Sequence, residues 1–288
     1  MARALPASHS ILIVEGHTDR RALMHILAPT VRIVPAHGKS VLLEAYDGLV
    51  GSGFDQKMFF LMDCDNDTPD NRKGMHDLAV TCHRDLEADL LFSLDAFDRV
   101  AIDFLSAVHY ELSAIESVAE RTLERALNLA AMCSVVRDAA RSCALRVRFT
   151  DPHSGHRRVA RPDDLRAQLP SATNLTLDLV ANAMGGVIGW TRDEVQGVLA
   201  ASPGIVSCPH TSEGCSACRL LTFCNGHDAV QALAYMLTTE TGIYVGAKEV
   251  EAQLRVGLDR RRVEHWPVGK RIRKWESRTG VRLLRERF

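Results

Sequence analysis

The stretch KMFFLMDCDND, from Lys57 to Asp67, decides the fold of this chain. It opens with an apolar run of the length of a strand and ends in three acids separated by single residues. A short apolar run of this kind is typical of a strand buried on both faces of a parallel sheet. In parallel sheets, ligands bind at the carboxyl ends of the strands. The stretch therefore predicts a parallel sheet with acids at its functional edge.

Similar runs lie on both sides of this stretch in the sequence. The expected strands cover residues 10–14, 31–35, 57–63 and 78–82, and helical spacing fills residues 19–27 and 40–49. Strands that alternate with helices of about ten residues predict βαβ units. We therefore expect an α/β fold with a Rossmann-like parallel sheet.

A mainly helical region is expected after the sheet. Apolar residues recur at helical spacing between residues 85 and 143. Further helical patterns cover residues 163–169, 175–184, 192–201, 228–238 and 248–257, whereas residues 144–149 are interpreted as a strand and residues 151–162 as a loop. We expect three parts: a catalytic domain over residues 1–92, a helical region over residues 93–254 and a basic segment over residues 255–288.

Composition places the chain among ordinary globular proteins. With 46% apolar and 25% charged residues in 288, it is not disordered, collagen-like or a coiled coil. The longest stretch without Asp, Glu, Lys or Arg, from Val195 to Ser212, contains two prolines and is too polar to cross a membrane. No secretory signal is evident after Arg3, because Glu15 interrupts the apolar run. We expect a cytoplasmic protein with no membrane partner.

Charge is unevenly distributed along the chain. The net charge is −1, yet residues 255–288 carry twelve Lys and Arg against four acids. Such a segment is either a nucleic-acid-binding surface or a solvated helix face. The residues proposed to bind nucleic acid are Arg260, Arg261, Arg262, Lys270, Arg271, Arg273 and Lys274.

Acidic side chains follow the ends of the predicted strands. Alternation along an extended chain places Asp63 and Asp65 on one side, and Glu15 joins them from the first strand. Convergent carboxylates repel one another unless a hard cation such as Mg²⁺ or Mn²⁺ neutralises them. The candidate metal ligands are Glu15, Asp19, Asp63, Asp65, Asp67 and Glu87, and the candidate catalytic residues are Glu15, Lys39, Asp63 and Asp65.

Each of these residues also has a structural interpretation. Acids at strand ends serve as helix caps or turn formers, and Asp19, Asp85 and Glu87 suit the first turn of a helix. Lys39 is either a contact for a substrate phosphate or a solvated side chain. It does not belong to a nucleotide-binding loop, because Ile33 occupies the position that requires glycine.

Four of the eight cysteines are clustered. Cys208, Cys215, Cys218 and Cys224 form the pattern C-x6-C-x2-C-x5-C, within residues 208–227. Four thiolates close a tetrahedral structural Zn²⁺ site, and the central pair has the spacing of a chelating knuckle. The alternative is a set of free buried thiols.

The order of these motifs resembles the TOPRIM domain of topoisomerases, primases and OLD-type nucleases. VEGHTD follows the first predicted strand, GK the second and DCDND the third. The resemblance implies that Glu15 acts as general acid or base, that Asp63 and Asp65 bind divalent metal, and that Asp19 is the acid after the Glu-Gly turn. It covers roughly 90 residues, and Cys64 stands where relatives carry a larger residue.

A narrower resemblance extends along the chain. TCHRDLE, CNGHDAVQAL and KWESRTG are similar to segments of the TOPRIM-bearing family that supplies the effector nuclease of the PARIS anti-phage system. This resemblance implies a toxic effector that is restrained by an ABC-type ATPase sensor, forms a homodimer when active and cleaves nucleic acid, with tRNA the class suggested. The cysteine cluster is a departure that puts the substrate in doubt.

Two functional hypotheses follow. In the first, the chain is a metal-dependent nuclease for RNA or DNA, in which bound metal activates water and Glu15 relays a proton. In the second, the sheet is a non-catalytic scaffold that binds nucleic acid or assembles with a partner through the zinc knuckle. A topoisomerase or primase is disfavoured, because the chain is short and its four tyrosines lie in no cleavage domain of adequate size.

Overall fold

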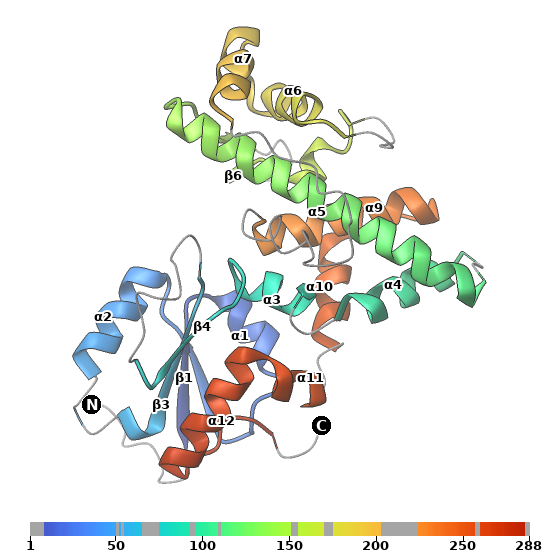
Figure 1. Cartoon of the computed structure of the whole chain (residues 1–288). Coiled ribbons are helices and arrows are strands. Elements are labelled where there is room, and N and C mark those ends of the chain that lie inside the picture. Colours follow the sequence, from blue (N-terminus) through green and yellow to red (C-terminus); the bar gives the residue numbers. More distant parts are fainter. Residues whose placement is uncertain are drawn as a thin grey trace. The chain divides into compact units, whose positions relative to one another are not determined.

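The computed structural model describes residues 9–49, 52, 55–64, 75–92, 96–108, 111–150, 155–169, 175–202, 224–256 and 260–285. The chain divides into two compact units (Figure 1). Unit 1 consists of residues 1–97 and 253–288, and unit 2 consists of residues 98–252. Unit 1 is therefore built from both ends of the sequence.

Unit 1 contains a four-stranded parallel sheet, as the sequence predicts. Its strands are β1 (Ser10–Val14), β2 (Val31–Pro35), β3 (Met58–Met62) and β4 (Leu78–Val80), in the order β2-β1-β3-β4. All neighbours are parallel, and Leu12 of β1 pairs with Ile33 on one side and Phe59 on the other. The α/β class and the position of every strand are confirmed.

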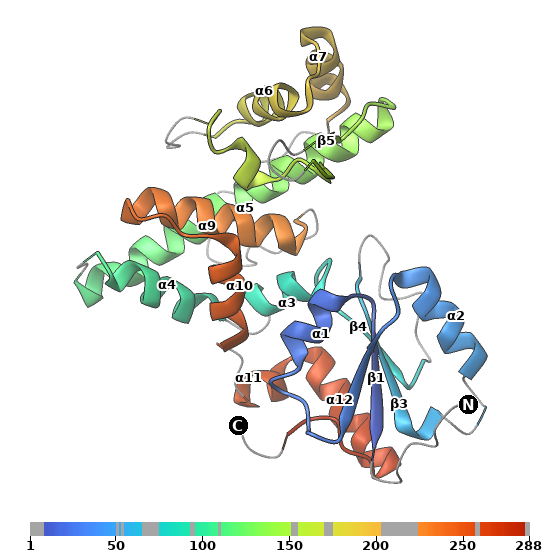
Figure 2. The same cartoon turned by 180° about the vertical axis from the view of Figure 1, so that it is seen from behind.

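Helices cover both faces of this sheet (Figures 1 and 2). The helices α1 (His17–Leu23) and α12 (Pro267–Thr279) pack on the face that carries Leu12, Val14 and Phe59. The opposite face, with Phe60, packs against α2 (Lys39–Leu49). Burial on both faces explains why the central strands β1 and β3 are almost entirely apolar, whereas the edge strand β2 also contains the exposed Arg32.

The basic C-terminal segment supplies part of the core of unit 1. Ile272 and Trp275 on α12 are 1% exposed, and the Trp275 ring meets the Phe59 ring edge-on at 5.7 Å between centroids. After α12 the chain returns to the sheet, where Leu284 forms a bridge with Leu27. Glu276 fixes this return, because its Oε1 accepts the backbone N–H groups of Leu283 and Leu284, each at 2.7 Å.

Shorter elements complete unit 1. The η1 turn (Asp55–Lys57) precedes β3, α3 (Leu86–Phe92) follows β4, and α11 (Arg260–His265) precedes α12. The boundaries between the units fall within α4 (Ala96–Ser106) and α10 (Ala247–Val256).

Unit 2 is mainly helical, as predicted. The long helix α5 (Leu112–Ser142) packs against α9 (Gly226–Thr241), and α6 (Leu177–Ile188) and α7 (Arg192–Ala201) pack on α5 (Figure 2).

Two local expectations in unit 2 are corrected. The loop expected over residues 151–162 contains the strand β6 (Arg157–Val159). This strand pairs antiparallel with β5 (Arg148–Thr150). The expected helix over residues 163–169 is the short 3₁₀ turn η3 (Pro162–Leu165). With three residues in β6 and four in η3, these elements are too short to show a period in the sequence.

A buried ion pair lies between the two central helices of unit 2. The guanidinium of Arg137 on α5 contacts the carboxylate of Asp228 on α9, and the two side chains are 7% and 2% exposed. Arg137 also donates to the Ala160 carbonyl at 3.0 Å and to Ser134 Oγ at 3.2 Å. Asp228 therefore has a structural partner, whereas Asn225 caps α9 by accepting the N–H of His227.

Candidate functional site

The carboxyl ends of β1 and β3 bring two of the predicted acids together. Glu15 follows β1, and its Oε1 accepts the backbone N–H of Asp63, which follows β3, at 2.8 Å. Because β1 and β3 are parallel neighbours, their carboxyl ends lie at one edge of the sheet. Glu15 is therefore directed across the strand ends, toward the backbone that carries Asp63.

Asp63 also anchors the helix that follows β4. Its Oδ1 accepts the N–H of Leu86, the first residue of α3, at 3.1 Å. Asp85 caps the same helix, because its Oδ1 accepts the N–H of Ala88 at 2.9 Å. Asp85 thus has the capping geometry that its position in the sequence suggests.

Four other acids carry charges that act on Asp63. Burial raises the pKa of Asp63 well above its usual value, and the charges of Asp19, Asp85, Glu15 and Glu87 raise this pKa further. Asp19, Asp85 and Glu87 are 5–6% exposed. The unit 1 sheet therefore concentrates negative charge in a partly desolvated place, which favours the binding of a cation.

Asp19 and Lys39 lie at the same edge. Asp19 Oδ2 accepts the N–H of Gly16 at 2.7 Å, so this acid stabilises the turn from β1 into α1. Lys39, at the start of α2, places its Nζ 3.4 Å from the carbonyl oxygen of Cys64. Its ammonium group is held beside the chain that leaves β3, and it is partly buried rather than fully solvated.

The turn between β2 and α2 depends on backbone conformations that are rare for most residues. His37 has φ 66° and Gly38 has φ 131°, a value that favours glycine. The Gly38 N–H donates to the Glu15 carbonyl at 3.0 Å, and the ring of His37 lies 5.0 Å from that of His17. Two histidines thus flank the acids at strand ends, although sequence analysis did not single them out.

A second feature that sequence analysis missed is the environment of Asp89, which is fully buried on α3. Its carboxylate accepts the N–H groups of Cys82 and His83 at 3.0 and 2.7 Å, and the indole N–H of Trp266 at 2.8 Å. His83 Nδ1 lies 2.8 Å from the same carboxylate. A ring nitrogen held by a buried carboxylate fixes the orientation of the imidazole, which is the arrangement used in general acid and base catalysis.

The chemistry of the acid cluster fits a hard divalent cation. Carboxylates are the ligands that Mg²⁺ and Mn²⁺ prefer. Within the described part of the chain, no three His, Cys, Asp or Glu side chains are arranged closely enough to hold a metal ion. Asp65 and Asp67, the other acids of the DCDND motif, lie outside the described residues.

Of the four clustered cysteines, the structure describes Cys224. Cys224 is fully buried, and its Sγ lies 3.4 Å from the carbonyl oxygen of Leu127. Cys208, Cys215 and Cys218 lie outside the described residues, so the zinc knuckle stays a prediction.

The basic candidates have different surroundings. Arg271 donates to the Met75 carbonyl at 3.0 Å, and Arg273 donates to Glu276 at 2.7 Å, so both contribute to contacts within unit 1. Lys270 and Lys274 are exposed on α12. Arg260, Arg261 and Arg262 begin α11, and their side chains are outside the described part.

Comparison with known proteins assigns no family to this chain. The chain matches no protein-family model and no curated protein. Among the helices that the structure describes, none has the length and apolar character needed to cross a membrane.

Proposed function

We propose that the chain is a metal-dependent nuclease whose catalytic centre lies at the carboxyl edge of the unit 1 sheet. The observation that carries this proposal is the hydrogen bond by which Glu15 Oε1 accepts the Asp63 N–H across the strand ends, at a place where burial, and then the charges of the neighbouring acids, raise the pKa of Asp63. Helix capping accounts for Asp85 and turn stabilisation for Asp19, but neither requires Glu15 to reach across to the next strand. The resemblance to TOPRIM domains gives the same assignment.

The residues of this edge have separable roles in the proposed reaction. Glu15 and Asp63 would hold Mg²⁺ or Mn²⁺ together with Asp65, and the bound ion would supply Lewis-acid activation of water and of the phosphodiester. Lys39 is placed to contact a phosphate oxygen, and Glu15 to accept or deliver a proton. His83, oriented by Asp89, is a further group that could carry a proton at this edge.

The partners follow from the resemblance. As a proposal, the nuclease acts on RNA such as tRNA, or on DNA, as the toxic effector of an anti-phage system, and an ABC-type ATPase restrains it until infection. Among the seven basic candidates, Lys270 and Lys274 have described side chains that are exposed and could contact the backbone of a nucleic acid. A homodimer is the proposed active form.

Cleavage assays test the proposal directly. Purified protein should cleave tRNA or plasmid DNA with Mg²⁺ or Mn²⁺ and lose activity in chelator, and Glu15→Gln should lower the rate at least a hundredfold, because it removes one charge and one proton-carrying group. Glu44→Gln, on the exposed side of α2, is the matched control and should retain activity.

The scaffold hypothesis predicts a different result. Under that hypothesis Glu15→Gln leaves nucleic-acid binding unchanged, and neither protein cleaves RNA or DNA at any metal concentration. Expression of the wild type should also slow growth more than expression of the Glu15→Gln protein if the chain is the toxic effector. Equal growth with intact RNA and DNA would contradict the nuclease assignment.

A further inference from the structure

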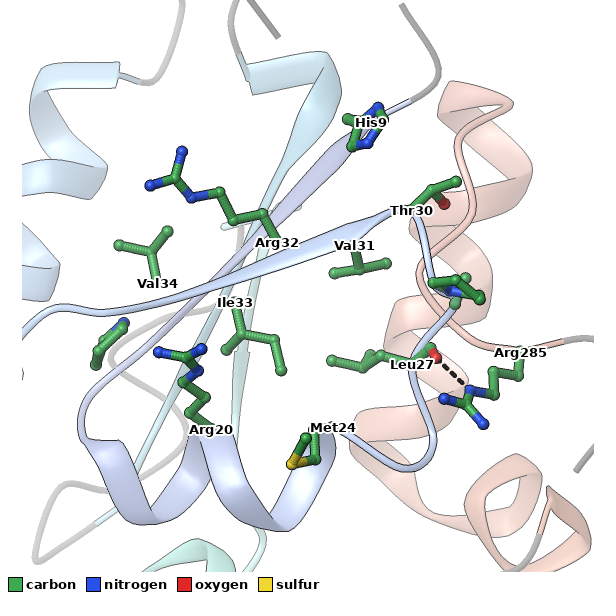
Figure 3. Close-up of a pocket in the computed structure, with 13 residues that line it drawn as sticks. His9, Arg20, Met24, Leu27, Thr30, Val31, Arg32, Ile33, Val34 and Arg285 are labelled. Carbon is green, nitrogen blue, oxygen red and sulfur yellow. Dashed lines mark hydrogen bonds between the residues drawn. The ribbon is translucent and has the colours of Figure 1, made fainter. Parts of the chain in front are cut away.

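A groove of about 650 Å³ lies along β2, the edge strand of the unit 1 sheet (Figure 3). Its lining combines apolar side chains with a slightly larger polar surface, and it comes from α1, the connection after α1, β2 itself, His9 and Arg285. Met24, at the end of α1, is 53% exposed within it. Val31 and Ile33 point toward α1, whereas Arg32 and Val34 point to the other side of the strand (Figure 3).

The backbone of β2 presents unpaired polar groups to this groove. In a parallel pair, alternate residues direct both N–H and C=O to the same neighbour. The bonds from Ser10 N–H to Thr30 and from Ala36 N–H to Val14 assign the even-numbered residues of β2 to β1. The outward groups are therefore the Ile33 N–H and the carbonyls of Val31, Ile33 and Pro35, which have no hydrogen-bond partner among the described residues.

The charged side chains that line the groove are all basic. Arg20, Arg32 and Arg285 contribute guanidinium groups, and His9 lies at its upper end in Figure 3. Arg285 Nε donates to the Leu27 carbonyl at 2.7 Å, while Arg20 and Arg32 have no ion pair within the described part of unit 1. None of the described residues that line the groove is an Asp or a Glu.

We propose that this groove binds an extended, acidic segment of a partner protein, which adds to β2 as a fifth strand. Strand addition at a sheet edge obtains affinity from main-chain hydrogen bonds and specificity from alternate side chains. Acidic side chains on one face of the added strand would meet either Arg20 and Arg285 or Arg32, according to the register in which the strand pairs with β2. This interaction does not depend on the nuclease function.

The hydrogen-bonding groups and charges along β2 disfavour two other ligands of the groove, a nucleic acid and a second copy of this chain. A nucleic-acid backbone would find donors in the arginine side chains, but its phosphates accept hydrogen bonds and donate none, so the three outward carbonyl oxygens of β2 would stay unpaired. A second copy of this chain would place Arg20 and Arg32 against the same residues, and like charges repel at such a contact. A peptide supplies the N–H groups that the three carbonyls lack.

Fluorescence anisotropy with the full chain tests the proposal. The probe is a labelled peptide of about seven residues, a normal strand length, that alternates Glu and Val. We expect saturable binding with a Kd below about 1 mM and no binding of the same peptide with Lys in place of Glu. The double variant Arg20→Glu, Arg32→Glu should weaken binding about tenfold or more.

Arg21→Glu is the matched control, because Arg21 is exposed on α1 next to Arg20 but does not line the groove. It should leave the affinity unchanged. Equal weakening by Arg21→Glu would show general electrostatic attraction and overturn the proposal. So would failure of the acidic peptide to bind, or its displacement by a single-stranded oligonucleotide at lower concentration.

N-methylated peptides test the hydrogen bonds without changing the protein. Methylation of every second residue, first at the Val positions and then at the Glu positions, removes the N–H groups of one edge of the peptide at a time. One of the two peptides should lose binding and the other should retain it. Equal affinity of both would exclude strand addition.

Discussion

Asp63 has opposing roles within unit 1. Its carboxylate stabilises the start of α3 by accepting the Leu86 N–H, yet it lies among four other acids in a partly buried place. The hydrogen bond requires only an oxygen acceptor, whereas the repulsion requires a charge. The two contributions can therefore be separated by one substitution.

We predict that Asp63→Asn stabilises the protein in chelator at neutral and alkaline pH. The amide oxygen retains the bond to Leu86, and the repulsion disappears. The expected gain is about 2–4 °C in melting temperature, which corresponds to about 1 kcal/mol for a chain of this length. Added Mg²⁺ should raise the melting temperature of the wild type and leave that of the variant unchanged.

The sign of the pH dependence follows from the raised pKa of Asp63. A carboxyl group with a folded pKa above its unfolded value stabilises the fold at acidic pH and loses this contribution as pH rises through the folded pKa. The advantage of Asp63→Asn should therefore shrink as the pH falls toward 4, about the pKa of an unfolded Asp. Asp47→Asn, on the exposed face of α2, should show no such trend. A variant less stable than the wild type at pH 8 would contradict this account.

The acids at the strand ends were predictable, whereas the environment of Asp89 was not. Glu15 and Asp63 each follow an apolar run directly, and parallel strands bring such residues to one edge. Asp89 meets Trp266 across 177 residues of sequence, and no local period carries that information. The hydrogen bonds of Asp89 depend on the packing of α3 against the segment that carries Trp266, which is a tertiary contact.

At the scale of elements, the contact between α11 and α12 depends on a missing side chain. A Cβ on Gly269 would lie 1.8 Å from the Val263 carbonyl oxygen, and this obstacle is backbone rather than a flexible side chain. Gly269 is buried in the first turns of α12, where glycine has no conformational advantage. Close approach of the two helices is thus the physical reason for this residue.

We predict that Gly269→Ala destabilises the protein by about 3 kcal/mol or more, at the upper end of the cost of overpacking. Gly48→Ala is the matched control, because Gly48 lies in α2 with open space around its Cβ position. It should stabilise the protein by up to about 1 kcal/mol through helix propensity. Urea unfolding measures both, and similar values for the two variants would refute the close-approach argument.

Sequence periodicity predicted some helices and strands correctly and missed others. The four strands were found because β3 and β4 are unbroken apolar runs and β1 and β2 contain one polar residue each, Ser10 and Arg32. The last helix was described by its charge, although Val268, Ile272 and Trp275 recur at helical spacing and are buried. The twelve basic residues between residue 255 and residue 288 suggested a charged surface segment and not a helix with a buried face. Of the hairpin, β5 overlaps the strand expected over residues 144–149, whereas β6, with two arginines in its three residues, was assigned to a loop.

At the scale of the whole molecule, the core of unit 1 joins residues from the two ends of the sequence. Trp266, Trp275 and Leu284 pack with Leu12, Phe59 and Leu61. We predict that Trp275→Ala costs about 3–5 kcal/mol, the usual penalty for truncating a buried aromatic side chain. Hydrogen exchange should accelerate in β1 and β3, more than 200 residues earlier in the sequence.

The hydrogen-exchange experiment on Trp275→Ala includes an internal control and a control variant. Amides in the middle of α5, which belongs to unit 2, should exchange at wild-type rates, and Lys274→Ala, at the exposed neighbouring position, should leave β1 protected. Loss of protection confined to α12, with β1 and β3 unaffected, would show that the sheet does not need this helix.

The discontinuity of unit 1 also has a consequence for the living cell during translation. The sheet strands leave the ribosome first, but the helix that covers one of their faces is made only after the roughly 150 residues of unit 2. A nascent domain folds as a unit once its whole sequence has been synthesised. Unit 2 can therefore fold while α12, which packs on the strands of unit 1, has not yet been synthesised. Glu15 and Asp63 would then be held in place only late in synthesis. A ribosome that carries an unfinished chain is thereby protected from the proposed nuclease, without any inhibitor.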